Sequence, residues 1–145
     1  CTLKELRFTV KTGEVVWNQE KDKVSDEGIL LIHSLNFKDG VMKFPEMTGE
    51  KKQYINGFKK LPLSGKSILI NRGYGNTYSL NCVLVDYPKY YAENHVNVIR
   101  GPDEHIDKVL QSLKSENTGL FIKYFVGNGA LSKTELESCL PIWLP

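Results

Sequence analysis

Short apolar runs separated by turn residues are the feature that most restricts how this chain can fold. The runs are rich in β-branched side chains, and none reaches the roughly 18 apolar residues that a membrane-spanning helix needs. Alternating or continuous apolar residues over such short stretches are typical of strands. We therefore expect strands at residues 3–10, 14–18, 29–37, 41–44, 66–71, 77–87, 96–99 and 120–126.

Two turns are predicted to join neighbouring runs as hairpins. Residues 11–13 end in a glycine and separate the first two runs, and Asp39-Gly40 separates the runs at 29–37 and 41–44. An Asp-Gly pair between apolar runs is a strong signal for a tight hairpin, because both positions favour a positive φ. The sequence thus predicts mainly antiparallel pairing in the first third of the chain.

Helical spacing appears only late in the chain. Residues 101–117 open with Pro102 and acidic residues, and Gly119 just beyond them is typical of a helix end. They carry an apolar face, which comprises Ile106, Val109, Leu110 and Leu113. A capping box at Ser132 and Glu135 predicts a second, short helix. We expect a mainly β, α+β fold: an antiparallel sheet or sandwich with one or two short helices late in a single domain, residues 1–145.

Motifs for catalysis, metals and cofactors do not assemble in the sequence. The chain has a net charge of only +2, which does not suggest a nucleic-acid partner. Gly65-Lys66-Ser67 lacks the first glycine of a phosphate loop, and no Gly-X-Ser-X-Gly, Cys-X-X-Cys or paired-histidine spacing is present. Cys82 and His95 could form a nucleophile–base pair, but an apolar strand raises a thiol pKa. We expect no catalytic residue, no metal, no cofactor and no enzymatic activity.

Tyrosines gather in the middle of the chain and suggest a contact surface. Because Pro88 removes a backbone donor, we expect residues 87–91 to leave the sheet as an exposed loop. Tyrosine offers a large, rigid contact at little entropic cost, so a protein-binding surface is predicted, formed by Tyr74, Tyr87, Tyr90 and Tyr91. Ordinary packing of these rings against the sheet edge is the alternative.

The first two residues, Cys1 and Thr2, resemble the start of a known class of processed protein. A chain that starts with Cys followed by a small residue resembles a bacterial lipoprotein after removal of its signal peptide. The resemblance implies a lipid on Cys1, a periplasmic domain and, because Thr2 is not Asp, anchoring to the outer membrane. The alternative is a chain cut by chance at a cysteine. The oxidising periplasm would in turn favour a disulfide between Cys82 and Cys139, against the alternative of two free buried thiols.

The chain is similar to small periplasmic immunity lipoproteins of type VI secretion in its small size, its start at Cys and its lack of catalytic residues. Leu61-Pro62-Leu63-Ser64, followed by Gly73-Tyr74-Gly75 and a long β-run, is loosely similar in layout. This resemblance implies a non-catalytic inhibitor that binds and neutralises a secreted toxin and touches the membrane only through its lipid. The alternatives are an accessory or pilot lipoprotein of a secretion or envelope complex, and a small-ligand carrier.

Overall fold

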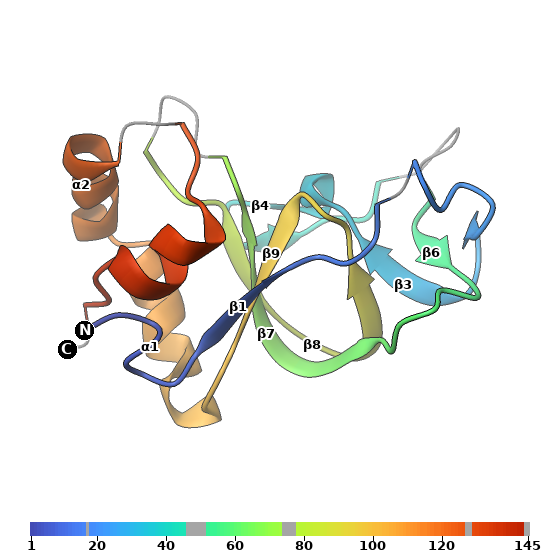
Figure 1. Cartoon of the computed structure of the whole chain (residues 1–145), viewed down its shortest axis with the longest axis horizontal. Coiled ribbons are helices and arrows are strands. Elements are labelled where there is room, and N and C mark those ends of the chain that lie inside the picture. The colour runs from blue at the N-terminus through green and yellow to red at the C-terminus, as the bar shows by residue number, and fades with distance from the viewer. Residues whose placement is uncertain (17, 46–51, 74–77, 127–128, 144–145) are drawn as a thin grey trace.

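A computed structural model describes residues 1–16, 18–45, 52–73, 78–126 and 129–143. It shows a mainly β, α+β fold, which confirms the predicted class (Figure 1). The strands are β1 (Thr9–Thr12), β2 (Val24–Ser25), β3 (Ile29–Ile32), β4 (Phe37–Lys38), β5 (Val41–Met42), β6 (Tyr54–Ile55), β7 (Leu63–Asn71), β8 (Cys82–Ala92) and β9 (Val96–Arg100). The helices are α1 (Asp103–Leu113) and α2 (Glu116–Phe125), with a 3-10 turn at Ser34–Asn36 and a π-helical turn at Glu135–Cys139.

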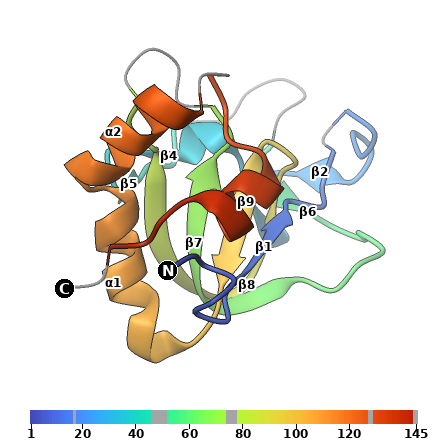
Figure 2. The same cartoon turned by 60° about the vertical axis from the view of Figure 1, so that its left-hand side comes forward.

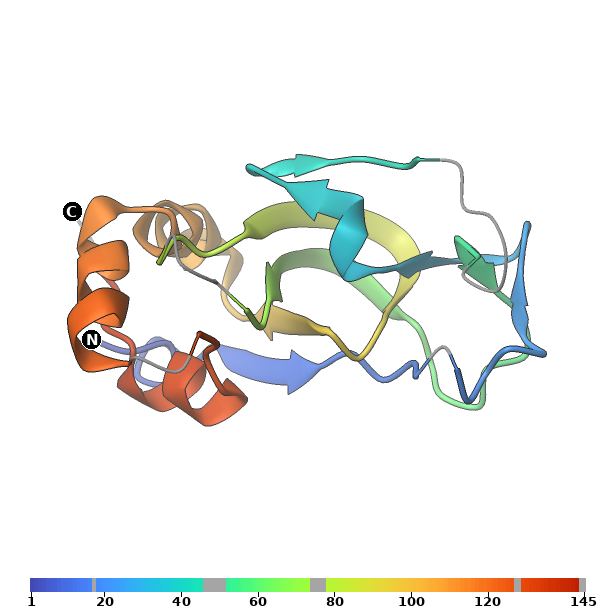
Figure 3. The ribbon, with the colours of Figure 1, turned by 90° about the horizontal axis from the view of Figure 1, so that it is seen from above.

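One seven-stranded sheet forms the centre of the molecule, in the order β1-β9-β7-β8-β3-β6-β2. Its pairs are antiparallel except for β3 and β8, which run parallel, so the sheet is mixed rather than wholly antiparallel. The long strands β7 and β8 curve strongly, which is clear when the ribbon is seen from above (Figure 3). β4 and β5 form a separate two-stranded sheet.

Both faces of the central strands are buried, which explains their continuous apolar runs. In β7, Ile68 and Ile70 pack into the cluster on the helical side, and Leu69 packs into the cluster on the other face. All three side chains are at most 1% exposed. Side chains alternate between faces along a strand, so a run without polar positions fits a sheet whose two faces are both covered.

The helices pack on one face of the part of the sheet formed by β1, β7, β9 and the start of β8 (Figure 2). On α1, Ile106, Val109 and Leu113 are buried as predicted, whereas Leu110 is only half-buried at the margin of the core. None of the helices in the described ranges has the length and apolar character needed to cross a membrane.

The predicted strand at residues 120–126 is wrong, because residues 120–125 belong to α2 and Val126 is its C-cap. The predicted single helix at 101–117 is in fact two helices: α1 ends at Leu113, and Ser115 caps α2 by accepting a hydrogen bond from the Thr118 amide at 3.4 Å. Gly119, which suggested a helix end, lies inside α2, where an added Cβ would sit 3.2 Å from the Tyr78 carbonyl oxygen. Packing against the core thus outweighs the β-propensity of the segment.

The first predicted hairpin is also wrong. β1 pairs with β9 instead of residues 14–18, and Val15 forms an isolated parallel bridge with Glu93. The outer edge of β1 is partly covered, because the Glu137 carboxylate accepts a hydrogen bond from the Val10 amide at 2.9 Å. A side chain that occupies an edge amide protects the edge against pairing with another chain.

The second predicted hairpin is confirmed. β4 and β5 pair across Asp39-Gly40, whose φ values of 54° and 76° match the tight turn expected of an Asp-Gly pair. The run at residues 29–37, however, is divided by the 3-10 turn at Ser34–Asn36. The capping box is present as predicted, with Ser132 and Glu135 exchanging hydrogen bonds of 3.0 and 3.1 Å.

Candidate functional site

The tyrosines predicted to form an exposed loop lie within β8, and Tyr74 falls outside the described residues. Tyr90 is fully buried, and its hydroxyl lies 2.5 Å from the Ser67 hydroxyl. Tyr91 is 6% exposed, and its hydroxyl donates to the Lys60 carbonyl at 2.5 Å. Burial raises the pKa of both phenols. The exposed-loop prediction is therefore wrong: Tyr90 and Tyr91 belong to the core, and Tyr87 is partly buried against the cluster that contains Tyr90.

Pro88 stays in the strand because the sheet is irregular there. The register runs from Leu63 opposite Tyr90 to Gly65 opposite Tyr87, so β8 holds one more residue than β7 in this interval. That extra residue makes a β-bulge, and a bulge tolerates a proline that cannot donate to the ladder. Pro88 therefore marks a β-bulge and not the end of a strand that the sequence predicts.

The predicted disulfide is absent: Cys1, Cys82 and Cys139 are all free. Cys82 is buried at the start of β8, whereas Cys139 is exposed at the end of the π-helical turn. Burial raises the pKa of the Cys82 thiol to about 11, and the Lys114 ammonium partly opposes this shift. At neutral pH Cys82 is therefore a protonated thiol and a poor nucleophile.

Cys82 and His95 are not brought together as a catalytic pair, because Cys82 is the first residue of the eleven-residue strand β8 and His95 lies in the turn that follows its other end. His95 instead pairs with the buried Glu93 carboxylate, with 2.5 Å between Nδ1 and Oε1. His33 is buried, and its Nε2 lies 2.9 Å from the Lys52 carbonyl oxygen. Within the described ranges, no group of three His, Cys, Asp or Glu side chains is placed to hold a metal ion.

An exposed aromatic face on α2 is the strongest candidate for a contact surface. Leu120, Tyr124 and Phe125 are 46, 70 and 76% exposed, although all three are large and apolar or aromatic. Phe121 is partly buried and stacks on Phe125 with 5.0 Å between ring centroids. Residues three and four apart on a helix are neighbours. These four side chains, which we call the α2 face, therefore form one patch.

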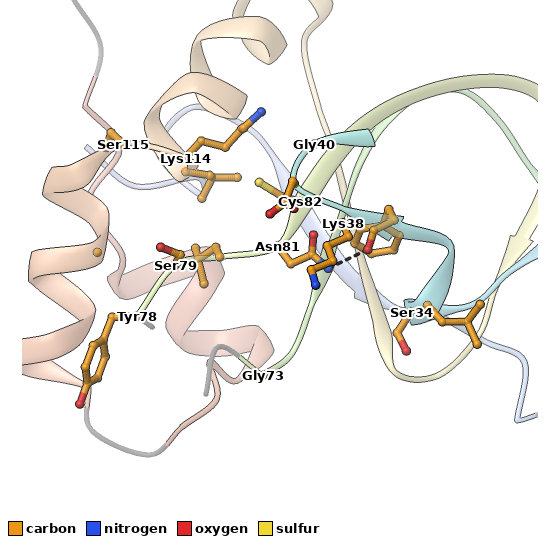
Figure 4. A pocket seen from close by; sticks show the side chains of 16 residues that line it. Ser34, Lys38, Gly40, Gly73, Tyr78, Ser79, Asn81, Cys82, Lys114 and Ser115 are labelled. Atoms are coloured by element: carbon orange, nitrogen blue, oxygen red, sulfur yellow. Dashed lines mark hydrogen bonds between the residues drawn. The ribbon is translucent and has the colours of Figure 1, made fainter. Parts of the chain in front are cut away.

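A cleft of about 800 Å³ lies beside α2, between the β4–β5 hairpin and the junction of the two helices (Figure 4). Its apolar floor consists of core residues at the start of β8 and the end of α1, including Leu80, Cys82 and Leu113. Lys38 and Lys114 contribute the positive charge of its lining, and Asp39 the negative charge. A shallower hollow, which also includes Lys114, continues from it to Leu120 and Lys123 on α2.

Sequence analysis missed both features for identifiable reasons. The α2 face was assigned to a strand, although a Ser-Glu pair at 115–116 marks a helix start and the aromatic spacing of three and four is helical. The cleft joins residues near positions 38, 81 and 114, and no local pattern predicts that meeting. Comparison with family models and with curated proteins finds no match for this chain.

Proposed function

We propose that this protein is a non-catalytic binding protein whose partner is another protein, and that the α2 face is its contact surface. The observation that carries the proposal is the exposure of Leu120, Tyr124 and Phe125 on one helix. A contiguous apolar patch on a soluble surface is costly to keep in water and often marks an interaction site. Burial by a partner removes that cost.

The composition of the α2 face suits a protein interface. Tyrosine is enriched among residues that dominate binding energy, and aromatic side chains bring a large area with few rotatable bonds. Stacking of Phe121 on Phe125 holds that ring in place before binding, and Lys123 lies 5.6 Å from the centroid of the Tyr124 ring. The patch is thus partly pre-organised, which lowers the entropy cost of association.

Within this class we favour an inhibitor or immunity protein that neutralises a secreted toxin, with a pilot or accessory lipoprotein as the second candidate. An immunity protein is normally encoded beside its toxin, and a pilot lies in a secretion-system cluster. The product of the neighbouring gene is therefore the partner to test. The proposal places the domain in the periplasm and anchors it to the outer membrane through Cys1, whose side chain is exposed.

Replacing Tyr124 with Ala is expected to weaken binding of the neighbouring gene product by about 2 kcal/mol or more, roughly 30-fold in Kd. Because Tyr124 is 70% exposed, its loss should leave the thermal midpoint nearly unchanged. Calorimetric titration of purified proteins measures the effect. Leu61→Ala is the matched control, since Leu61 is exposed but lies outside the helices. Equal affinity of the wild type and the Tyr124 variant would remove the α2 face from the interface.

The anchor is tested separately on protein extracted with detergent from its native host. We expect the N-terminal peptide to carry added lipid mass on Cys1, and a Cys1→Ala variant to leave the membrane fraction. Mass spectrometry of that peptide is the measurement. An unmodified Cys1 in membrane-extracted protein would contradict the anchor without touching the protein-binding proposal.

A further inference from the structure

We infer that the cleft between the β4–β5 hairpin and the α1–α2 junction binds a small amphipathic carboxylate, with its acid group at Lys114 and its apolar body on the cleft floor. The cleft lining contains none of the four residues of the α2 face, and its ligand is of a different class from the proposed protein partner. It rests on two observations: the shape of the cleft and the two lysines in its lining, which form no ion pair with any described residue.

The cleft has the size of a small-molecule site. Its volume of about 800 Å³ lies within the range of roughly 300–1,000 Å³ that is usual for ligand pockets. Rigid elements form its walls: the start of β8 and the end of α1 belong to the main core, and the β4–β5 turn faces them. The cleft is therefore present without a rearrangement of the fold.

Two lysines give the cleft an excess of positive charge over the single carboxylate of Asp39. Among the described residues, neither Lys38 nor Lys114 forms an ion pair. The Lys114 ammonium lies against the hairpin turn, because a Cβ added to Gly40 would be only 2.5 Å from Nζ. An anionic group entering the cleft would meet an ammonium that has no competing partner, and charge-assisted hydrogen bonds are the stronger ones.

Asn81 adds a polar position to the lining. Its side-chain amide donates to the Phe37 carbonyl at 2.8 Å, which fixes its orientation. Its Oδ1 is buried and accepts no hydrogen bond from any residue that the structure describes. The bond to Phe37 therefore holds Asn81 in place as a polar part of the cleft wall beside the β4–β5 hairpin.

The thiol of the neighbouring Cys82 is not expected to form a covalent bond with the ligand. Cys82 borders the cleft, but burial keeps its pKa near 11, so it remains protonated at neutral pH. Figure 4 shows Cys82 and Lys114 near each other in the lining. The ligand is thus held by charge, hydrogen bonds and apolar contact, and it is released unchanged.

Anilinonaphthalene sulfonate, an aromatic monoanion whose fluorescence rises in an apolar site, is the probe. We expect saturable binding to the folded protein and displacement by decanoate below its micelle concentration. Decyltrimethylammonium, whose alkyl chain is only one carbon longer and whose head group is positive, should not displace the probe. Lys114→Met keeps the apolar stem and removes the charge, so Kd for the probe and for decanoate should rise about 5- to 10-fold. Lys38→Met should act in the same direction but less.

Two controls keep the result interpretable. Lys108→Met removes an exposed charge from α1 outside the cleft and should leave Kd unchanged. Tyr124→Ser removes the centre of the α2 face and should also leave it unchanged; a loss of signal in that variant would assign the probe to α2 and overturn the inference. Equal affinity of wild type and Lys114→Met, or equal displacement by the cationic amphiphile, would overturn it as well. Thermal melts confirm that each variant is folded.

Discussion

Replacing Tyr90 with Ala is expected to lower the free energy of unfolding by about 3–5 kcal/mol, as for other large aromatic side chains removed from a core. Among the residues that the structure describes, Tyr90 is the largest fully buried side chain, and it belongs to the apolar cluster on the face of the sheet away from the helices. Its ring also contacts Tyr87 edge-on, with 6.0 Å between centroids. The truncation would leave a cavity, and it would also leave the Ser67 hydroxyl without its hydrogen-bond partner.

Tyr90→Phe separates these two causes. The ring stays in place, so only the hydrogen bond to Ser67 is lost, at a cost of about 1–2 kcal/mol. Burial raises the pKa of Tyr90 in the folded state. Its contribution to stability is therefore complete below the unfolded pKa of about 10 and is lost as pH rises above it. The variant should accordingly lose less stability than the wild type in that range.

Urea unfolding followed by circular dichroism measures both changes. Tyr124→Ala is the matched control, because the same substitution at a 70% exposed position should change stability by no more than about 0.5 kcal/mol. A loss below about 1 kcal/mol for Tyr90→Ala would mean that β8 does not hold this ring in the core. The tyrosine would then again be available for a surface role.

The strands were predictable where local chemistry decides them. The Asp39-Gly40 turn fixed the β4–β5 hairpin, and the apolar runs at β7 and β9 marked buried strands. β1 was misassigned because its partner, β9, lies more than 80 residues away in the sequence. Nothing in the first twenty residues distinguishes that partner from the nearby run at 14–18. Long-range pairing is settled by the packing of the whole sheet, which local patterns do not contain.

The sequence predicts the wrong contact surface because two residues, Pro88 and Gly119, have ambiguous structural preferences. Pro88 predicts the end of a strand, although a one-residue bulge accommodates it and keeps Tyr90 and Tyr91 inside. Gly119 predicts the end of a helix, although it allows α2 to approach Tyr78. As a result, the sequence predicts that tyrosines of β8 are exposed although they are buried. It also predicts a strand where the exposed aromatic residues of α2 lie. Both residues are ambiguous until their neighbours in space are known.

Replacing Ile106 with Ala is expected to cost about 2–5 kcal/mol in the free energy of unfolding, because its side chain is fully buried between α1 and the sheet. Alanine is the best helix former, so the substitution does not weaken the helix itself. The measured loss would thus report the packing of α1 on the core.

Leu110→Ala on the same helix is the comparison, measured by urea unfolding at equal m-value. Leu110 is only partly buried at the margin of the same cluster, so its loss should cost less than about 2 kcal/mol. The sequence pattern places both residues on one apolar face and does not rank them, whereas the structure does. A larger cost for Leu110 than for Ile106 would mean that α1 is rotated about its axis. Because Lys114 follows one turn after Leu110 on that helix, such a rotation would also move its ammonium out of the cleft.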